Sequence, residues 1–216
     1  MVEPDALLPP LVAGSAERDV SDLIYERLAE LRGGGSPLDS SALAPRLATR
    51  WERVNPVTLR FHLRGGARWQ DSTPITAADV VFSFTAYADS TLDSQARPVV
   101  AGRINAKAED DSTVLIHFAA PDAEQWYDAT WHVRILPRHI WDSIPRSRWA
   151  GSQSTQRMIG SGPYRLSGWT KGQTLTLERS DLAQDPPAIR RLIWRFAGGD
   201  PDAALNLVLS HEADLL

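Results

Sequence analysis

The sequence predicts an α/β fold of the α+β kind, built around a mixed sheet. Residues 58–64 alternate strictly between polar and apolar types, which is the period of a strand with one buried face. Residues 77–87 then form a largely apolar run behind a helix-capping signal. Two later stretches each alternate around a short polar turn, as hairpins do: residues 103–118 and 164–177. Strands and helices therefore alternate along one chain.

The first strand, its turn and the following helix form a continuous unit. Leu59, Phe61 and Leu63 are the apolar positions of the strand, and two glycines end it because they favour a tight turn. A cluster of turn-forming residues at 71–74 follows. Thr76 is the expected N-cap of the helix, with Asp79 three residues later as its acidic partner.

Four further segments complete the expected elements. Residues 21–31 have the apolar spacing of an amphipathic helix. Residues 43–52 suggest a short helix, since Leu47 and Trp51 are four positions apart and would meet on one side. The remaining expectations are a short helix over 121–130, a strand over 189–196 and a helix over 203–210.

Composition excludes several classes of function. The chain has 216 residues with a net charge of −4, so it lacks the basic field that nucleic-acid binding requires. It contains no cysteine, which excludes disulfides, thiol catalysis and thiolate-bound metals. The first residues lack a signal-peptide pattern, and no apolar run approaches the roughly 20 residues of a membrane-spanning helix. We expect no cofactor.

The region from Phe61 to Ser83 resembles family 5 of the extracellular solute-binding proteins, the receptors of peptide and nickel ABC importers. The family pattern F-x-L-R-x-G-x-x-W-x-D-G-x-P, followed by a T-A-x-D-V helix start, recurs here with serine at position 72 in place of glycine. Three shorter motifs also resemble the family: Tyr25-Glu26-x-Leu28, Ile135-Leu136-Pro137-Arg138-His139 and Gly160-Ser161-Gly162-Pro163-Tyr164. The family's Tyr-Trp pair is missing from residues 181–187.

The resemblance implies a fold like that of the type II periplasmic binding proteins, in which two lobes close on a ligand. It implies that residues 1–42 start the first lobe, that 43–158 form its smaller subdomain, and that 159–216 return to the lobe. The second lobe is then missing from this chain. The native signal and any lipid anchor are likewise expected to lie outside it.

The function that the resemblance implies is an extracytoplasmic receptor, periplasmic or extracellular, that delivers a solute to an ABC permease. Oligopeptides are the first ligand expected, and contact with the membrane would come only through the permease or a lipid anchor. Trp131, His132 and Arg134 are the expected ligand-binding residues, because the family places residues before the I-L-P segment near its cleft. Glu3 joins them from the extended segment at the cleft rim.

Other interpretations stay open at this point. A sensor or other binding module could use the same fold without feeding transport. A hydrolase would need a nucleophile such as Ser161 with His132 or His139, at a spacing that matches no known motif. The same two histidines could be a metal pair, but no carboxylate stands at a suitable spacing beside them. Asp110 and Asp111 are expected to be turn formers rather than a catalytic carboxylate pair.

Overall fold

A computed structural model describes residues 3–196, 198, 201–210 and 214 of the chain. The helices are α1 (Ser15–Ile24), α2 (Ala77–Ala88), α3 (Arg97–Val100), α4 (Gln125–Thr130), α5 (Arg138–Trp141) and α6 (Pro201–Leu209). The strands are β1 (Ala29–Leu31), β2 (Leu43–Pro45), β3 (Ala48–Asn55), β4 (Thr58–Leu63), β5 (Ile104–Ala108), β6 (Thr113–Phe118), β7 (Tyr164–Thr170), β8 (Thr174–Arg179) and β9 (Arg191–Arg195). Short 3-10 turns occupy Pro9–Leu11, Ser40–Ala42, Arg146–Arg148 and Ala150–Ser152.

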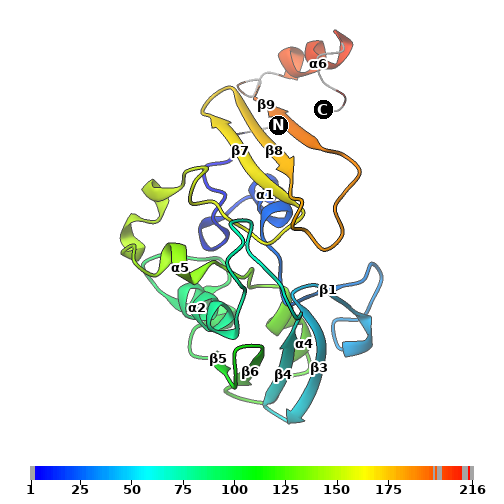
Figure 1. Ribbon diagram of the computed structural model, residues 1–216, viewed down its shortest axis with the longest axis vertical. Coiled ribbons are helices and arrows are strands. Elements are labelled where there is room, and N and C mark those ends of the chain that lie inside the picture. The colour runs from blue at the N-terminus through cyan, green and yellow to red at the C-terminus, as the bar shows by residue number, and fades with distance from the viewer. Residues whose placement is uncertain (1–2, 197, 199–200, 211–213, 215–216) are drawn as a thin grey trace.

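Three sheets organise these strands, and the pairings among the described residues are antiparallel. β3, β4, β6 and β5 form a four-stranded sheet in that order, with α2 and α4 beside it at the lower end of the molecule in Figure 1. β7, β8 and β9 form a second sheet at the upper end, next to α1. The short pair β1–β2 lies at the side of the larger sheet. The α/β character expected from the sequence is confirmed, whereas the sheets in the described part of the chain are antiparallel rather than mixed.

The unit from β4 to α2 folds as the sequence predicts. Leu59, Phe61 and Leu63 are buried and face the core. The carboxylate of Asp79 accepts hydrogen bonds from the backbone N–H of Thr76 at 2.8 Å and from its hydroxyl at 3.2 Å, so the acidic half of the capping box is present. Ser72, which replaces the family glycine, has a φ of 72°. The turn is therefore kept, with a serine in the left-handed conformation that glycine adopts more easily.

The expected helix over residues 21–31 is wrong in its position. α1 begins at Ser15 and ends at Ile24, and the chain then becomes extended before β1. Distant segments take the carbonyl groups that would continue the helix: Gly162 N–H donates to the Ile24 oxygen at 2.8 Å, and Ile135 N–H donates to the Glu26 oxygen at 2.9 Å. Tertiary hydrogen bonds therefore override the helical periodicity of this segment.

The short helix expected over residues 43–52 is also wrong, because β2 and β3 occupy this segment. β3 pairs with β4, and Trp51 lies opposite Phe61 with 6.4 Å between the ring centroids. Leu47 is fully buried, and Trp51 packs partly against the same core. Positions four apart share one side in a strand as well as in a helix, so this spacing could not separate the two structures.

The remaining expectations agree with the structure where it describes them. The hairpins β5–β6 and β7–β8 are present, as are α4 and β9. α4 and β9 are shorter than their predicted ranges, and α6 covers Pro201–Leu209 where a helix over 203–210 was expected. Asp110 accepts a hydrogen bond from the Ser112 N–H at 2.7 Å, which confirms its role in the turn between β5 and β6. Residues 212–216, which resemble the family's G-E-x-D strand entry, lie outside the described residues except for Asp214.

Two hydrophobic cores hold the elements together. The first lies between α2 and the four-stranded sheet and includes Phe61, Trp69 and Phe84. The second lies between α1, α2 and the upper sheet and includes Trp141 and Trp149. α2 contributes side chains to both cores, so this one helix joins the two ends of the molecule.

Candidate functional site

A cluster of aromatic side chains surrounds the end of α4. Trp131 stacks on Tyr127, with 5.6 Å between the ring centroids and 15° between the planes. The ring of His132 meets Tyr127 edge-on at 5.5 Å. Trp131 is 37% exposed, although it packs against another ring. This exposed indole, held in place by its neighbours, can receive a planar or apolar ligand group.

Arg27 supports this tryptophan. Its Nε donates a hydrogen bond to the Trp131 carbonyl oxygen at 2.8 Å, and its guanidinium lies 4.7 Å from the indole centroid. Burial lowers the pKa of Arg27, and the positive charge of Arg134 lowers it further, while Asp22 and Glu30 oppose the change. Arg27 is only 3% exposed, so its charge depends on these carboxylates for compensation.

Arg134 is also buried, and it shares a partner with Arg27. Its Nε donates to one carboxylate oxygen of Asp22, while Arg27 Nη2 lies 3.0 Å from the other oxygen. Burial tends to lower the pKa of Arg134, but the hydrogen bond to Asp22 and the contact with Tyr87 raise it overall. The Nη2 atom of Arg134 is buried and finds no acceptor among the described residues. Arg134 is therefore a buried cation held by Asp22, with one donor atom still lacking an acceptor among the described residues.

The other two expected residues differ in their surroundings. His132 lies beside the cluster, with its Nε2 3.2 Å from Asp128 Oδ1. Glu3 instead contacts the turn between β7 and β8, where its carboxylate accepts from Trp169 Nε1 at 3.0 Å and from the Gly172 N–H at 2.9 Å. The structure thus brings Trp131, His132 and Arg134 into one cluster, whereas the contacts of Glu3 belong to the upper sheet.

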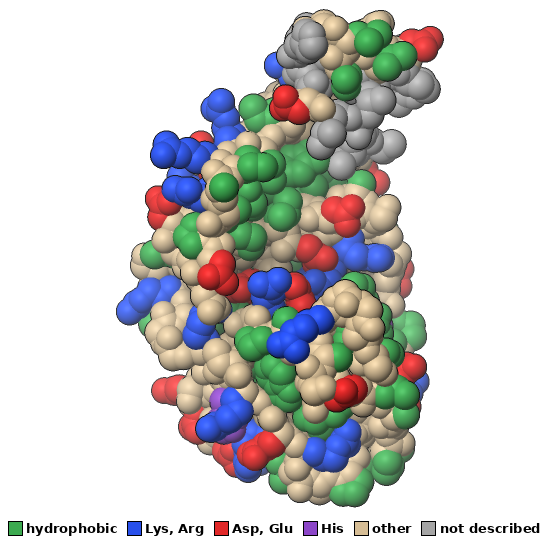
Figure 2. Space-filling view, turned by 90° about the vertical axis from the view of Figure 1, so that its right-hand side faces the viewer, with side chains coloured by type: hydrophobic (Ala, Val, Ile, Leu, Met, Phe, Trp, Pro, Cys, Tyr) green, Lys and Arg blue, Asp and Glu red, His purple; other side chains and the backbone are tan. Residues whose placement is uncertain are grey.

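A polar hollow of about 230 Å³ shares Asp22 with this cluster. Its other charged lining residues are Glu26, Glu30, Arg46 and Asp185. Burial raises the pKa of Glu26, although Arg64 and Arg46 counteract this. In Figure 2, side chains of both signs lie next to one another across the middle of the face shown. The hollow is smaller than the roughly 300 Å³ at which whole-ligand pockets begin, so it can hold at most one group of a ligand.

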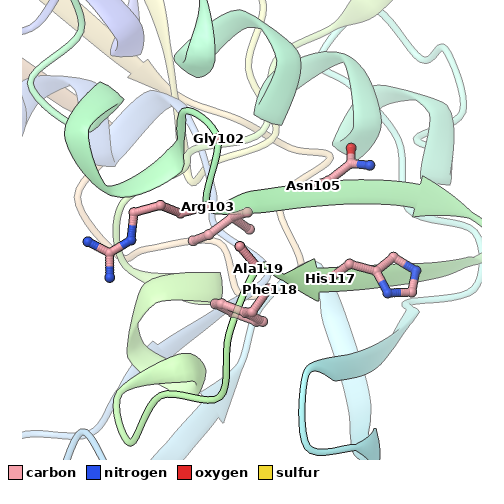
Figure 3. A pocket seen from close by; sticks show the side chains of 7 residues that line it. Gly102, Arg103, Asn105, His117, Phe118 and Ala119 are labelled. Carbon is pink, nitrogen blue, oxygen red and sulfur yellow. The ribbon is translucent and has the colours of Figure 1, made fainter.

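A second hollow of about 430 Å³ lies at the end of the β5–β6 hairpin. Figure 3 shows that the Arg103 side chain points away from Asn105 and His117, so the polar groups around it do not converge. A binding site needs a few polar groups aimed at one place. We therefore place the candidate site at the end of α4.

The described residues do not pair Ser161 with either histidine considered for a hydrolase. The Oγ of Ser161 accepts from the Glu26 N–H at 3.3 Å, while His132 and His139 are engaged by Asp128 and Asp71. No group of three or more His, Asp or Glu side chains in the described ranges is arranged to hold a metal ion. None of the helices in the described part of the chain has the length and apolar character that crossing a bilayer requires.

Sequence reasoning missed three residues of the cluster: Asp22, Arg27 and Tyr127. Tyr127 and Trp131 are four positions apart, as are Asp128 and His132, which is the spacing of neighbours on a helix, but the helix expected over 121–130 stops short of Trp131 and His132. Asp22 and Arg27 are five positions apart, and they meet only because α1 ends between them. No local pattern could have indicated that pair.

Comparison with known proteins decides the family. The sequence pattern described as "Bacterial extracellular solute-binding proteins, family 5 Middle" matches residues 42–216, which is most of the chain. The chain belongs to this family. Family 5 consists of solute-binding proteins rather than enzymes.

Individual relatives agree with this membership. Periplasmic oligopeptide-binding protein OppA of Salmonella typhimurium is 28% identical over 199 residues, covering 82% of this chain and 34% of its own. The crystal structure of Haemophilus influenzae OppA in complex with RPPGFSPFR has a TM-score of 0.81 at 20% identity, over 98% of this chain and 43% of that one. NikZ of Campylobacter jejuni in complex with Ni(L-His) has a TM-score of 0.78 at 21% identity, over 95% and 39%.

These structural likenesses show that this family 5 chain has the fold of the corresponding part of those proteins. The chain spans between about a third and less than half of the length of these relatives. The fold expected from the sequence is therefore confirmed for the part present.

Proposed function

We propose that this chain is part of an extracytoplasmic receptor that binds oligopeptides and delivers them to an ABC importer. Its family membership supports a solute-binding role, and the names of its relatives favour peptides as the ligand. The periplasm or the cell exterior is the compartment in which such a receptor works. The permease is the partner that the proposal implies.

The proposal includes a division of the chain into three parts: residues 1–42 and 159–216 in the first lobe, and 43–158 as its smaller subdomain. The two hydrophobic cores support this division, because the first consists mainly of residues from the middle segment. The second combines residues from both ends of the chain with one side of α2 and the segment around Trp141 and Trp149. Ligand would be held between this lobe and a second one.

The exposed indole of Trp131 carries the site proposal. Its stacking on Tyr127 and its contact with Arg27 fix the ring before any ligand arrives, which lowers the entropic cost of binding. An aromatic surface of this kind suits a peptide bond plane or an apolar side chain. We assign direct contact to Trp131 and His132, and orientation of the site to Arg134. Glu3 is proposed as a rim contact through the β7–β8 turn.

The test is calorimetric titration of the full-length protein with tri-alanine, penta-alanine, RPPGFSPFR and a nickel–histidine complex. We expect binding of at least one peptide, and a loss of about tenfold or more in affinity for Trp131→Ala, because a central aromatic anchor contributes about 2 kcal/mol. Ile189→Ala is the matched control, since Ile189 is an apolar residue that is 59% exposed on another part of the surface.

Three outcomes contradict the proposal in different ways. Binding of none of the peptides rejects the peptide receptor. Binding of the nickel complex alone keeps the receptor and changes its ligand. Equal peptide affinities for Trp131→Ala and Ile189→Ala would move the site away from α4.

A further inference from the structure

The carboxylate of Asp22 is the shared hydrogen-bond partner of the two buried arginines of the candidate site, Arg27 and Arg134. One oxygen accepts from Arg134 Nε, and the other lies 3.0 Å from Arg27 Nη2. Arg27 then donates through Nε to the Trp131 carbonyl oxygen and places its guanidinium against the indole. A continuous series of contacts therefore runs from Asp22 through Arg27 to the exposed tryptophan.

We propose that Asp22 is a positioning residue that fixes the Trp131 ring in its ligand-accepting orientation by holding Arg27 beneath it. This inference rests on the proposed function and assigns Asp22 a role that acts on Trp131 through Arg27. It assigns the rigidity of the aromatic surface to a charge on α1, an element distant in sequence from Trp131.

The charges around Asp22 explain why one carboxylate has this effect. Arg27 and Arg134 are 3% and 7% exposed, and both positive charges converge on Asp22. Without the carboxylate they would repel each other in a place with little solvent to screen them. Glu30 would still be near Arg27, but its Oε1 is 3.7 Å from Nη1, and Glu30 is also paired with Arg46. The hold on Arg27 would therefore weaken.

A role in folding alone is the rival explanation, since buried ion pairs also affect stability. The two explanations differ at Trp131. If Asp22 acts through Arg27 on the indole, its substitution changes the environment of this one ring. If it only stabilises the fold, the ring keeps its orientation in the molecules that remain folded, and the effects of Asp22 and Trp131 substitutions on binding add independently.

The first experiment needs no ligand. Acrylamide quenching of tryptophan fluorescence is measured for the wild-type protein and for Asp22→Asn, each also in a Trp131→Phe background. The difference between backgrounds isolates Trp131 from the other seven tryptophans of the chain. We expect about a twofold rise in the quenching constant of Trp131 when Asp22 is replaced, because a released ring exposes more of its surface.

Asp89→Asn is the matched control for this experiment. Asp89 also forms a half-buried ion pair, with Arg146 Nη1 at 2.6 Å, and its other carboxylate oxygen accepts from the Thr91 N–H at 2.7 Å. Asp22→Glu is the conservative variant, expected to restore part of the wild-type quenching because it keeps the charge. An unchanged Trp131 signal in Asp22→Asn, or an equal change in Asp89→Asn, would overturn the inference.

The second experiment is a double-mutant cycle on binding of RPPGFSPFR, or of whichever peptide of the series above binds. We expect Asp22→Asn to weaken binding about tenfold alone and to add almost nothing once Trp131 is alanine, since the two residues act as a unit. Additive losses would show that Asp22 does not act through Trp131. If the wild-type protein binds no peptide, the proposed function fails, while the quenching experiment still decides the role of Asp22.

Discussion

Gly160 lies so close to the end of α1 that a Cβ atom built on it would be 1.8 Å from the carbonyl oxygen of Ile24. Its neighbour Gly162 is nearly as restricted, at 2.6 Å from the Leu23 oxygen, and its N–H donates to Ile24. The contact with backbone leaves no side chain that could rotate out of the way. The glycines of the G-S-G-P-Y segment therefore serve close packing, and the segment ends α1 where the site residues Asp22 and Arg27 need it to end.

Gly160→Ala is expected to destabilise the protein by about 3 kcal/mol, because the backbone of one segment must move to admit the methyl group. Urea unfolding measures this change. Gly65→Ala is the control, since nothing lies within 4 Å of the Cβ position there, and its effect should stay within about 1 kcal/mol. Equal effects of the two substitutions would show that α1 does not need this close approach.

Glu17 makes stability depend on pH. Burial tends to raise its pKa, but hydrogen bonds from the N–H groups of Gly14, Ala13 and Asp5 lower it overall below the usual 4.5. The folded protein therefore binds this proton less readily than the unfolded chain does. The resulting stability is complete above about pH 4.5 and is lost as the pH falls through the folded pKa.

Glu17→Gln should therefore be less stable than the wild-type protein near neutral pH, with a difference that shrinks on acidification. Urea unfolding from about pH 7 to about pH 3 measures both proteins over the window that the lowered pKa defines. A difference that stays constant over the whole range would mean that the carboxylate charge at this position does not contribute.

At the scale of elements, Asp79 connects α2 to α5 and so to the segment before it that carries Arg134. One carboxylate oxygen caps the start of α2 at Thr76, and the other accepts from the Arg138 N–H at 2.9 Å. Asp79 is 4% exposed, so water cannot replace these bonds easily. The helix-capping signal seen in the sequence thus also positions a second element, which the sequence pattern alone did not reveal.

Asp79→Ala is expected to cost about 3 kcal/mol, combining a lost cap with a buried N–H left without an acceptor. Asp110→Ala removes an exposed turn carboxylate that accepts from the Ser112 N–H, and it should cost less than about 1 kcal/mol. Thermal unfolding compares the two variants. A loss for Asp79→Ala as small as that for Asp110→Ala would mean that α5 is held without this bond.

Local patterns predicted the elements whose structure is decided locally. β4, α2 and the two hairpins carry their period and their turn residues in their own sequence, and all are present. The end of α1 was not predictable, because hydrogen bonds from residues more than 100 positions away decide it. The same cause hid Asp22 and Arg27, while Trp131, His132 and Arg134 were expected only through the family resemblance.

At the scale of the whole molecule, α2 joins two cores that would otherwise be separate. Phe84 is 2% exposed in the core beneath the four-stranded sheet, and Phe82 is 8% exposed in the core beneath the upper sheet, where it lies 5.9 Å from Trp149. Because both rings come from one helix, melting of either core removes support from the other. The site at the end of α4 also combines the two sides of α2 in the sequence, because Arg27 precedes this helix and Arg134 follows it.

We therefore expect the 216-residue chain to unfold in a single calorimetric transition, with equal calorimetric and van't Hoff enthalpies. Phe82→Ala and Phe84→Ala should each lower the midpoint of that transition by roughly 6 to 12 °C, from a loss of about 3 kcal/mol per buried ring. Two transitions, each responding to only one substitution, would show that the cores are independent. In that case the orientation of α1 relative to α4, on which the Asp22–Arg27–Trp131 contacts depend, would not be fixed by α2.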